Sequence, residues 1–315
     1  MAKPFPPALP RCSNDFVKAT APAIPLVLPA EKGWISVYAD LVKARLTLLV
    51  LVTTLVGFYA GLRGPMDWSL LIQALLGTGL VASGAAALNQ LWERDLDSRM
   101  RRTADRPLPS GRLQPATVLV FGTGCAVSGL VWLALAVNPL TSAIGAATLV
   151  SYLFIYTPLK RVTWLNTLIG AIPGGLPPLM GWTAAHGAAS VEGWALFAIL
   201  AFWQIPHFMA IAWMYRDEYA RAGFVMLPVV DRDGRRTGRQ AVGHSLALLA
   251  VSLCPFFLGL AGVVYLVGAL ALGFLFTGCA VQFARQLTMT RARQLFFASI
   301  LYLPLLLALL VLDKK

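Results

Sequence analysis

Charged residues are rare in this chain. Only 13% of its 315 residues are Asp, Glu, Lys or Arg, whereas 58% are hydrophobic, and soluble globular domains carry roughly 25% charged residues. Apolar runs long enough to cross a bilayer, which takes about 20 helical residues each, recur along the chain with short polar breaks. No soluble core can absorb all of these runs, so the composition places most of the chain in lipid.

Cysteine is also scarce, and its spacing carries no motif. The four cysteines are Cys12, Cys125, Cys254 and Cys279. None of them forms a CxxC or CxxCH pattern or a metal-ligand spacing, which argues against a disulfide framework and against covalent haem attachment.

A recognisable signal peptide is absent as well. Residues 1–35 are rich in proline and lack a positively charged start followed at once by an apolar core and a cleavage site. We expect residues 1–35 to form a disordered cytoplasmic leader and residues 36–315 to form one intramembrane domain.

Hydropathy predicts an all-α, polytopic membrane bundle of about nine transmembrane helices. The candidate spans are 42–62, 68–91, 115–137, 139–157, 163–185, 191–213, 241–260, 262–283 and 295–312. At two joints, Asn138-Pro139 and Ala261, hydropathy does not distinguish two spans joined by a tight turn from one long buried segment. The pattern is therefore compatible with seven to nine spans.

The placement of Lys and Arg predicts the orientation, because loops that stay in the cytoplasm keep basic residues. With nine spans and a cytoplasmic N-terminus, 23 of the 26 Lys and Arg residues fall on one side of the membrane. The net charge of +12 is explained by anionic lipid headgroups, and no nucleic-acid partner is expected. This predicts a multi-pass protein of the cell inner (cytoplasmic) membrane.

The few acidic residues are concentrated, since eight of fourteen follow the second or the sixth span. Asn89, Glu93 and Asp97 recur at i, i+4 and i+8, so they share one helical face over about 12 Å, while Asp95 points the other way. Three oxygen ligands in a row suit Mg²⁺ bound together with a phosphate. The alternative is a solvated helix end whose carboxylates pair with neighbouring arginines. The amide at the membrane edge, where polar groups are costly, favours a functional site.

The segment after the sixth span carries Asp217, Glu218, Asp231 and Asp233. If the helix continued past Pro206, the side chains of Trp203, Gln204, Glu218 and Arg221 would lie within about 60° of the direction of His207, with Asp217 to one side. Both acidic segments also end in a Leu-Pro and a Gly-Arg pair, which hints at a four-helix repeat whose shared site lies at the interface.

Histidine and the basic loops supply the other candidates. His207 is the one histidine placed within a span near the cytoplasmic side, and the alternative for it is an interhelical hydrogen bond. His186 falls in an outer loop and His244 has no acidic neighbours, so neither is assigned to the site. The candidates for binding a phosphate leaving group are Arg102, Arg106, Lys160, Arg161 and Arg216. Ordinary positive-inside bias is the alternative for each of them.

Four motifs in order resemble one family from about residue 35 to the C-terminus. They are NQLWERDLDSRMRRTADRPLPSGR, YTPLKR, FWQIPHF and DEYARAGFVMLPVV. Together they resemble the protohaem IX farnesyltransferases, or haem O synthases, within the UbiA superfamily of intramembrane prenyltransferases.

The resemblance implies roles for individual residues. Asn89, Glu93 and Asp97 match a first acidic motif that binds Mg²⁺, and Arg102, Thr103, Arg106 and Pro107 match the loop after it. Trp203, Gln204, Pro206 and His207 match the stretch that marks the haem branch, while Tyr219 and Gly223 match the second motif. Where the family favours Asp before the tyrosine, this chain has Glu218 preceded by Asp217, so either of the two could contact the metal.

The implied reaction transfers a farnesyl group from farnesyl diphosphate to a vinyl group of haem B, with addition of water and with Mg²⁺ bridging the diphosphate. Haem B is a substrate there, not a cofactor. The expected partners are farnesyl diphosphate, haem B and membrane lipid, with the haem A synthase or oxidase assembly machinery as candidates to receive the product. The alternatives are a sister prenyltransferase with an aromatic or quinone-precursor acceptor and, from another class, a haem or lipid transporter.

Overall fold

A computed structural model describes residues 32–315, of which Trp34–Lys315 form one compact unit. The predicted leader falls largely outside the described residues, and helix α1 begins at Trp34, so it includes the last two residues of the predicted leader. The helices are α1 Trp34–Leu41, α2 Ala44–Gly61, α3 Trp68–Asp97, α4 Pro115–Ala136, α5 Pro139–Val150, a π-helix η1 Ser151–Tyr156, α6 Thr157–Leu159, α7 Asn166–His186, α8 Val191–Met214, α9 Arg216–Ala222, α10 Leu227–Val230, α11 Arg235–Ser252, α12 Cys254–Phe257, α13 Val263–Gln286 and α14 Met289–Leu312. Within the described part of the chain there is no β-strand, so the prediction of an all-α membrane bundle is confirmed.

Eight helical segments among residues 32–315 are long and apolar enough to cross a membrane. They correspond to eight of the nine predicted spans, with ends that differ by a few residues. The segment predicted at 163–185 is the helix α7, which is equally long but contains Pro173, Pro177 and Pro178. That α7 is a ninth transmembrane helix stays a prediction.

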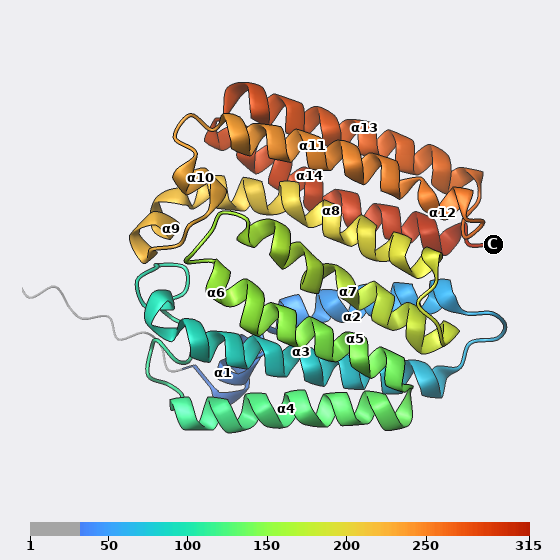
Figure 1. The fold of residues 1–315 in the computed structure, drawn as a ribbon, viewed down its shortest axis with the longest axis horizontal. Coiled ribbons are helices and arrows are strands. Elements are labelled where there is room, and N and C mark those ends of the chain that lie inside the picture. The colour runs from blue at the N-terminus through green and yellow to red at the C-terminus, as the bar shows by residue number, and fades with distance from the viewer. Residues whose placement is uncertain (1–31) are drawn as a thin grey trace, which may run out of the picture. The chain divides into compact units, whose positions relative to one another are not determined.

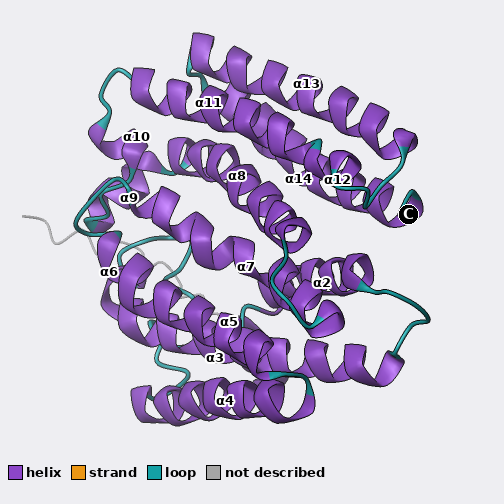
Figure 2. Cartoon of the chain, turned by 45° about the vertical axis from the view of Figure 1, so that its right-hand side comes forward, coloured by secondary structure: helices purple, strands orange, loops and turns teal. Residues whose placement is uncertain are grey.

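Helix α7 lies at the centre of the bundle and packs against α2, α5 and α8 (Figure 2). Close crossing requires small residues: a Cβ added to Gly181 would lie 1.9 Å from the carbonyl oxygen of Thr54, and one added to Gly57 would lie 2.0 Å from that of Pro178. Small residues let helix backbones approach in membranes, where lipid provides no hydrophobic drive for association. The Gly and Pro content of α7 therefore serves packing between helices.

The long helices run back and forth, so their connections collect at two ends (Figure 1). The segments 98–114, 160–165, 215–234 and 287–288 lie at the left in Figure 1, and we call this the charged end. The connections 62–67 and 187–190 and the C-terminus lie at the other end. The two acidic segments thus share one end of the bundle.

Candidate active site

Asn89, Glu93 and Asp97 lie on the last turns of α3, which stays helical for 30 residues up to Asp97. All three side chains are buried, at 0%, 4% and 1% exposure of the residue, whereas the side chain of Asp95 is 78% exposed and pairs with Arg94. A buried carboxylate is stable only when it is paired or hydrogen-bonded. The partners of Glu93 and Asp97 therefore define the site.

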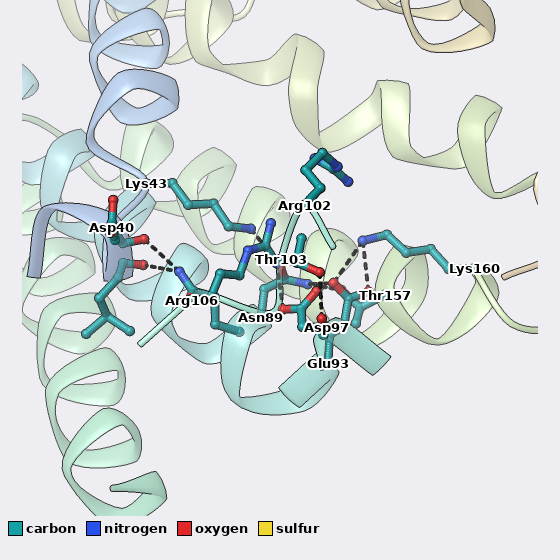
Figure 3. Close-up of polar contacts among 12 residues, drawn as sticks. Asp40, Lys43, Asn89, Glu93, Asp97, Arg102, Thr103, Arg106, Thr157 and Lys160 are labelled. Atoms are coloured by element: carbon teal, nitrogen blue, oxygen red, sulfur yellow. Dashed lines mark hydrogen bonds and ion pairs between the residues drawn. The ribbon is translucent and has the colours of Figure 1, made fainter. Parts of the chain in front are cut away.

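Each buried carboxylate has a cationic partner from a different segment (Figure 3). The Lys160 ammonium donates to both carboxylate oxygens of Glu93, at 2.9 and 3.2 Å. Arg106 Nη1 donates to Asp97 Oδ2 at 2.6 Å. The adjacent arginines of the helix end do not fill this role, so the interpretation as an ordinary solvated helix end is wrong for these two residues.

Asn89 links Glu93 to two further residues, Lys43 and Thr157. Its amide nitrogen donates to Glu93 Oε2 and to Thr157 Oγ1, both at 3.1 Å. Its amide oxygen accepts a hydrogen bond of 2.8 Å from the Lys43 ammonium. The structure thus brings together five predicted residues, Asn89, Glu93, Asp97, Arg106 and Lys160, and adds two, Lys43 and Thr157.

Lys43 precedes α2 in a left-handed conformation, with φ of 50°, which is uncommon outside glycine. The preceding turn is held by Gln90, whose side-chain amide donates to the carbonyl oxygens of Asp40 and Leu41, both at 2.8 Å. Burial lowers the pKa of Lys43 to about 7, and the positive charges of Arg106 and Lys160 act in the same direction. The sequence offered only one signal for Lys43, a basic residue at the start of a span, which positive-inside bias also explains.

A tight turn after α3 brings Arg106 back to Asp97. The Thr103 hydroxyl donates to the Asp97 carbonyl oxygen at 2.8 Å, and the Arg106 amide donates to the Thr103 carbonyl oxygen at 3.0 Å. Thr103 is buried. The threonine and arginine of the motif therefore act as one local unit that closes over the carboxylate.

The π-helix η1 and the short α6 position Lys160. The Lys160 ammonium lies 4.5 Å from the centre of the Tyr156 ring, and Tyr156 stacks on Tyr152. Burial by itself lowers the pKa of Lys160, but Tyr156 and Glu93 outweigh it, so the net pKa lies above the ordinary value. Single π-turns inside α-helices frequently occur at functional sites.

The second acidic segment is arranged differently. Helix α8 ends at Met214, and Tyr215 leaves the helical region with φ of −113° and ψ of 20° before α9 begins. The expectation that Glu218 and Arg221 share a helical face with His207 is therefore wrong, because the helix does not continue. The Asp217 side chain is 89% exposed and lies 3.6 Å from Arg216, and Arg161 is also exposed. Glu218 is half-buried.

Contacts nevertheless join the two acidic segments. Arg102 Nη2 donates to the Tyr219 hydroxyl at 3.3 Å, and its guanidinium lies 5.7 Å from the centre of the Tyr215 ring. Beneath this pair, Met100 packs in one apolar cluster with Ala222 and Phe224. Arg102 and Tyr219 are thus neighbours, as the prediction of a common diphosphate site requires.

The predicted haem residues lie within α8 and face two directions. The Trp203 indole donates to the Ser299 carbonyl oxygen at 2.8 Å, and His207 Nδ1 lies 2.7 Å from the Ser299 hydroxyl. The Gln204 side chain faces α7, where a Cβ on Gly174 would meet its oxygen at 2.0 Å. His207 makes the interhelical hydrogen bond considered from the sequence, and a haem role for these residues stays a prediction.

The donor set suits a cation that shares its ligands with a phosphate. Among residues 32–315 no group of three or more His, Cys, Asp or Glu side chains is placed to hold a metal. Glu93 and Asp97 lie one turn apart, and Mg²⁺ is usually bound by one or two carboxylates plus waters and phosphate oxygens. The two carboxylates therefore fit a substrate-bridging Mg²⁺ rather than an all-protein metal cage.

The fold and this cluster define a class: a membrane helical bundle with paired carboxylates and cations at one end, suited to a phosphorylated substrate. The sequence matches the UbiA prenyltransferase family over residues 50–302. The chain belongs to this family and is a membrane prenyltransferase.

Among similar curated proteins are several protoheme IX farnesyltransferases. The one from Solibacter usitatus is 51% identical over 88% of this chain and 98% of its own length, and the one from Koribacter versatilis is 46% identical over 88% and 93%. The human mitochondrial protoheme IX farnesyltransferase is 40% identical over 89% of this chain and 62% of its own length. These matches agree with the resemblance inferred from the four motifs.

Solved structures share the fold at low identity. A UbiA homologue from Archaeoglobus fulgidus bound to DMAPP and Mg²⁺ superposes with a TM-score of 0.64 at 16% identity, covering 87% of this chain and 98% of that one. A digeranylgeranylglyceryl phosphate synthase gives a TM-score of 0.76 at 15% identity, covering 89% and 98%.

Proposed function

We propose that this protein transfers the farnesyl group of farnesyl diphosphate to a vinyl group of haem B, with addition of water, to give haem O and diphosphate. The observation that carries the proposal is the 51% identity to a protoheme IX farnesyltransferase over 98% of that protein. The cluster at the charged end supports the diphosphate half, because it supplies both the cations and the carboxylates that such a substrate needs.

The cations would bind the diphosphate by exchanging partners. Lys160 and Arg106 pair with Glu93 and Asp97. Lys43 donates to the neutral oxygens of Asn89 and Tyr152, at 2.8 and 3.5 Å. An incoming diphosphate offers these donors stronger anionic acceptors in charge-assisted hydrogen bonds. The freed carboxylates of Glu93 and Asp97, together with Asn89, would hold Mg²⁺, which when bound supplies charge stabilisation to the departing diphosphate.

The side chains then assist bond cleavage by electrostatics. The bond between the farnesyl carbon and the diphosphate oxygen breaks with both electrons going to the oxygen, and preorganised cations stabilise that developing charge. The terminal vinyl carbon of haem bonds to the farnesyl carbon, water adds to the inner vinyl carbon, and one proton is released. No side chain is needed as a nucleophile, so the protein's role is to position two lipophilic substrates and limit water.

The second acidic segment would complete the diphosphate site. Tyr219, held by Arg102, would orient the diphosphate, and Glu218 is the second-segment candidate for metal contact. Arg161 and Arg216 lie toward solvent, so we assign them a role in attracting the anionic substrate. Asp217 is also exposed, but its negative charge gives it no part in that attraction. Trp203, Gln204 and His207 are proposed to shape the haem side of the site.

Incubation of purified protein with haem B, farnesyl diphosphate and Mg²⁺, followed by mass analysis of the pigment, tests the proposal. A product heavier by one farnesyl group and one hydroxyl group is expected. Conversion of an aromatic or quinone-precursor acceptor, with haem B left unchanged, would instead identify a sister prenyltransferase. Neither conversion, with haem transport into vesicles, would identify a transporter.

We also propose that the charged end faces the cytoplasm and that the protein resides in the cell inner membrane, because basic residues gather at this end. In a background without native cysteines, Ser110→Cys and Arg232→Cys should react with an impermeant maleimide only from the cytoplasmic side. Ala188→Cys, in the connection at the other end, should react only from outside. Labelling of Ser110 and Arg232 from opposite sides would contradict the shared site.

A further inference from the structure

An open groove of about 570 Å³ lies at the charged end. One wall is a single face of α11, formed by residues at i, i+3, i+4, i+7 and i+8. These residues are Arg236, Arg239, Gln240, Gly243 and His244, and Trp164 and Leu227 line the rest of the groove. The volume is that of a small-molecule site, for which about 300–1,000 Å³ is typical.

His244 is prepared as a metal ligand. Its Nδ1 lies 2.8 Å from the carbonyl oxygen of Gln240, and a carbonyl oxygen can only accept, so Nδ1 carries the proton. This fixes the tautomer with a free electron pair on Nε2, as in histidines that bind metals through one nitrogen and donate to a carbonyl from the other. Among residues 32–315 no group forms a hydrogen bond with Nε2 of His244.

His207 presents a different environment. Its ring stacks against Trp203 and Phe296, with centroid distances of 4.9 and 5.1 Å, and its Nδ1 contacts the Ser299 hydroxyl. Because a hydroxyl can donate or accept, that contact does not fix the tautomer. Of the two histidines, His244 is therefore the better candidate for iron ligation.

The groove also offers two guanidinium groups and flat apolar surface. Arg236 and Arg239 are exposed, and neither forms a salt bridge with a carboxylate among residues 32–315, whereas the neighbouring Arg235 lies 3.4 Å from Asp233. Guanidinium groups bind carboxylates in bidentate fashion. At Gly243 a Cβ would meet nothing within 4 Å, so a flat ligand could approach the α11 backbone opposite Trp164.

The groove adjoins the diphosphate site through the 160–166 segment. Lys160, which holds Glu93, is four residues from Trp164, and four extended residues span at most about 14 Å. The segment is braced: the Val225 amide donates to the Lys160 carbonyl oxygen at 2.7 Å, and the Asn166 side chain donates to the Val225 carbonyl oxygen at 2.8 Å. A ligand in the groove therefore lies at the same end of the bundle as the place proposed for the diphosphate, with the 160–166 segment between them.

We propose that this groove binds the haem substrate, with His244 Nε2 on the iron and with Arg236 and Arg239 on the two propionates. The inference rests on the proposed function, which makes haem B the acceptor. One histidine nitrogen, two guanidinium groups and an aromatic wall match the iron, the two carboxylates and the flat macrocycle of haem. Anionic lipid headgroups could also bind the arginines, but they make no use of the prepared His244 nitrogen.

Equilibrium titration of the purified full chain with haem B, read from the Soret band, tests the inference. His244→Ala should shift the Soret band and weaken haem affinity by about tenfold or more, and added imidazole should restore the band. His186→Ala is the matched control and should leave the band in place. Affinity for a non-hydrolysable farnesyl diphosphate analogue should stay at the wild-type value in His244→Ala, which also shows that the variant is folded.

The propionate contacts are tested with haem dimethyl ester, which lacks the carboxylate charges. The double variant Arg236→Gln/Arg239→Gln should weaken binding of haem B by about tenfold and leave binding of the ester unchanged, whereas Arg285→Gln/Arg293→Gln should change neither. Equal loss for both ligands would overturn the propionate assignment. In nanodiscs, competition between phosphatidylglycerol and haem B that disappears in the double variant, with no effect of His244→Ala, would identify a lipid-headgroup site instead.

A wrong groove assignment and a wrong proposed function would give different experimental results. If the wild-type protein produces haem O but His244→Ala retains the Soret band and the haem affinity, only the groove assignment is wrong. If the wild-type protein binds haem B through His244 and forms no haem O, the proposed function is wrong.

Discussion

The two acidic segments at the charged end look alike in sequence and differ in what their carboxylates do. In the first, Glu93 and Asp97 are buried and paired with Lys160 and Arg106. In the second, Asp231 is buried but accepts hydrogen bonds from the amide and hydroxyl of Thr237, at 2.7 and 2.9 Å. The first segment therefore binds cationic side chains, whereas the buried carboxylate of the second stabilises the start of α11.

The helices before the two segments explain this difference. Helix α3 stays regular through both acidic turns, so its carboxylates are carried on one face against α6. Helix α8 ends at Met214, and the chain turns into the short α9, so Asp217 points into solvent. The Gly-Arg pairs do match, since Gly111 and Gly234 both adopt positive φ, at 74° and 69°. Similar residue types thus give similar turns and different sites.

The largest effect should come from removing a carboxylate of the first segment. Glu93→Gln and Asp97→Asn should each lower turnover by about 10²–10³-fold, the loss typical of one electrostatic stabiliser. Asp95→Asn, on the exposed face, should stay within about twofold of wild type. The turnover rate with farnesyl diphosphate and haem B is measured for all three variants. Equal losses at all three positions would indicate a structural charge network.

The ion pair between Glu93 and Lys160 means that Glu93→Gln can also lower stability, so a control variant is needed. Glu93→Gln leaves Lys160 without its partner, and an unpaired buried charge can cost about 3–5 kcal/mol of stability. The double variant Glu93→Gln/Lys160→Met should regain thermal stability in detergent and remain inactive. Recovery of activity together with stability would show that Glu93 serves folding alone.

Removal of divalent metal should have an effect of similar size. Chelation should abolish turnover, and added Mg²⁺ should restore it, because the anionic carboxylates of Glu93 and Asp97 can share a site with an anionic diphosphate only through a bound cation. Haem binding should persist during chelation, as measured by the Soret band. Full turnover in excess chelator would exclude a metal between Glu93, Asp97 and the diphosphate.

Lys43 should have an intermediate effect. Lys43→Met removes a donor that faces Asn89 and should raise the Kd for a non-hydrolysable farnesyl diphosphate analogue by about tenfold, since a hydrogen bond to a charged group contributes roughly 1.5–3 kcal/mol. Arg45→Met, two residues further on and exposed, is the matched control and should leave the Kd unchanged. An equal change in both would point to general attraction of the anion by positive charge.

The smallest effects on turnover should come from the second segment. Asp231→Ala removes the acceptor of two hydrogen bonds at the start of α11 and should cost about 0.5–2 kcal/mol of stability with little change in turnover. Asp217→Asn should alter neither the melting temperature nor turnover by a measurable amount. A loss of turnover in Asp231→Ala without a loss of stability would make the two acidic segments functionally equivalent.

Much of the fold follows from hydropathy and charge. Eight of nine predicted spans coincide with long apolar helices, because the length of a spanning helix is set by the bilayer and not by partners. The shared face of Asn89, Glu93 and Asp97 follows from helical periodicity alone. The end of α8 at Met214 could not be predicted from the sequence. Pro206 suggests a bend before that point, but the helix continues through Pro206 to Met214.

Spans, the clustering of basic loops at one end and the helical face of the first acidic motif were thus determined by local sequence, since they depend on periodicity and on transfer of side chains into lipid. Only the tertiary structure decided which cation meets which carboxylate. Lys43 is 46 residues from Asn89 and Lys160 is 67 residues from Glu93, and no periodic rule relates such distant positions. It also decided that His244, whose Nδ1 is bonded to the Gln240 carbonyl oxygen of its own helix, lines a groove with two arginines. That groove exists because α11 and the segment that carries Trp164 lie on either side of it.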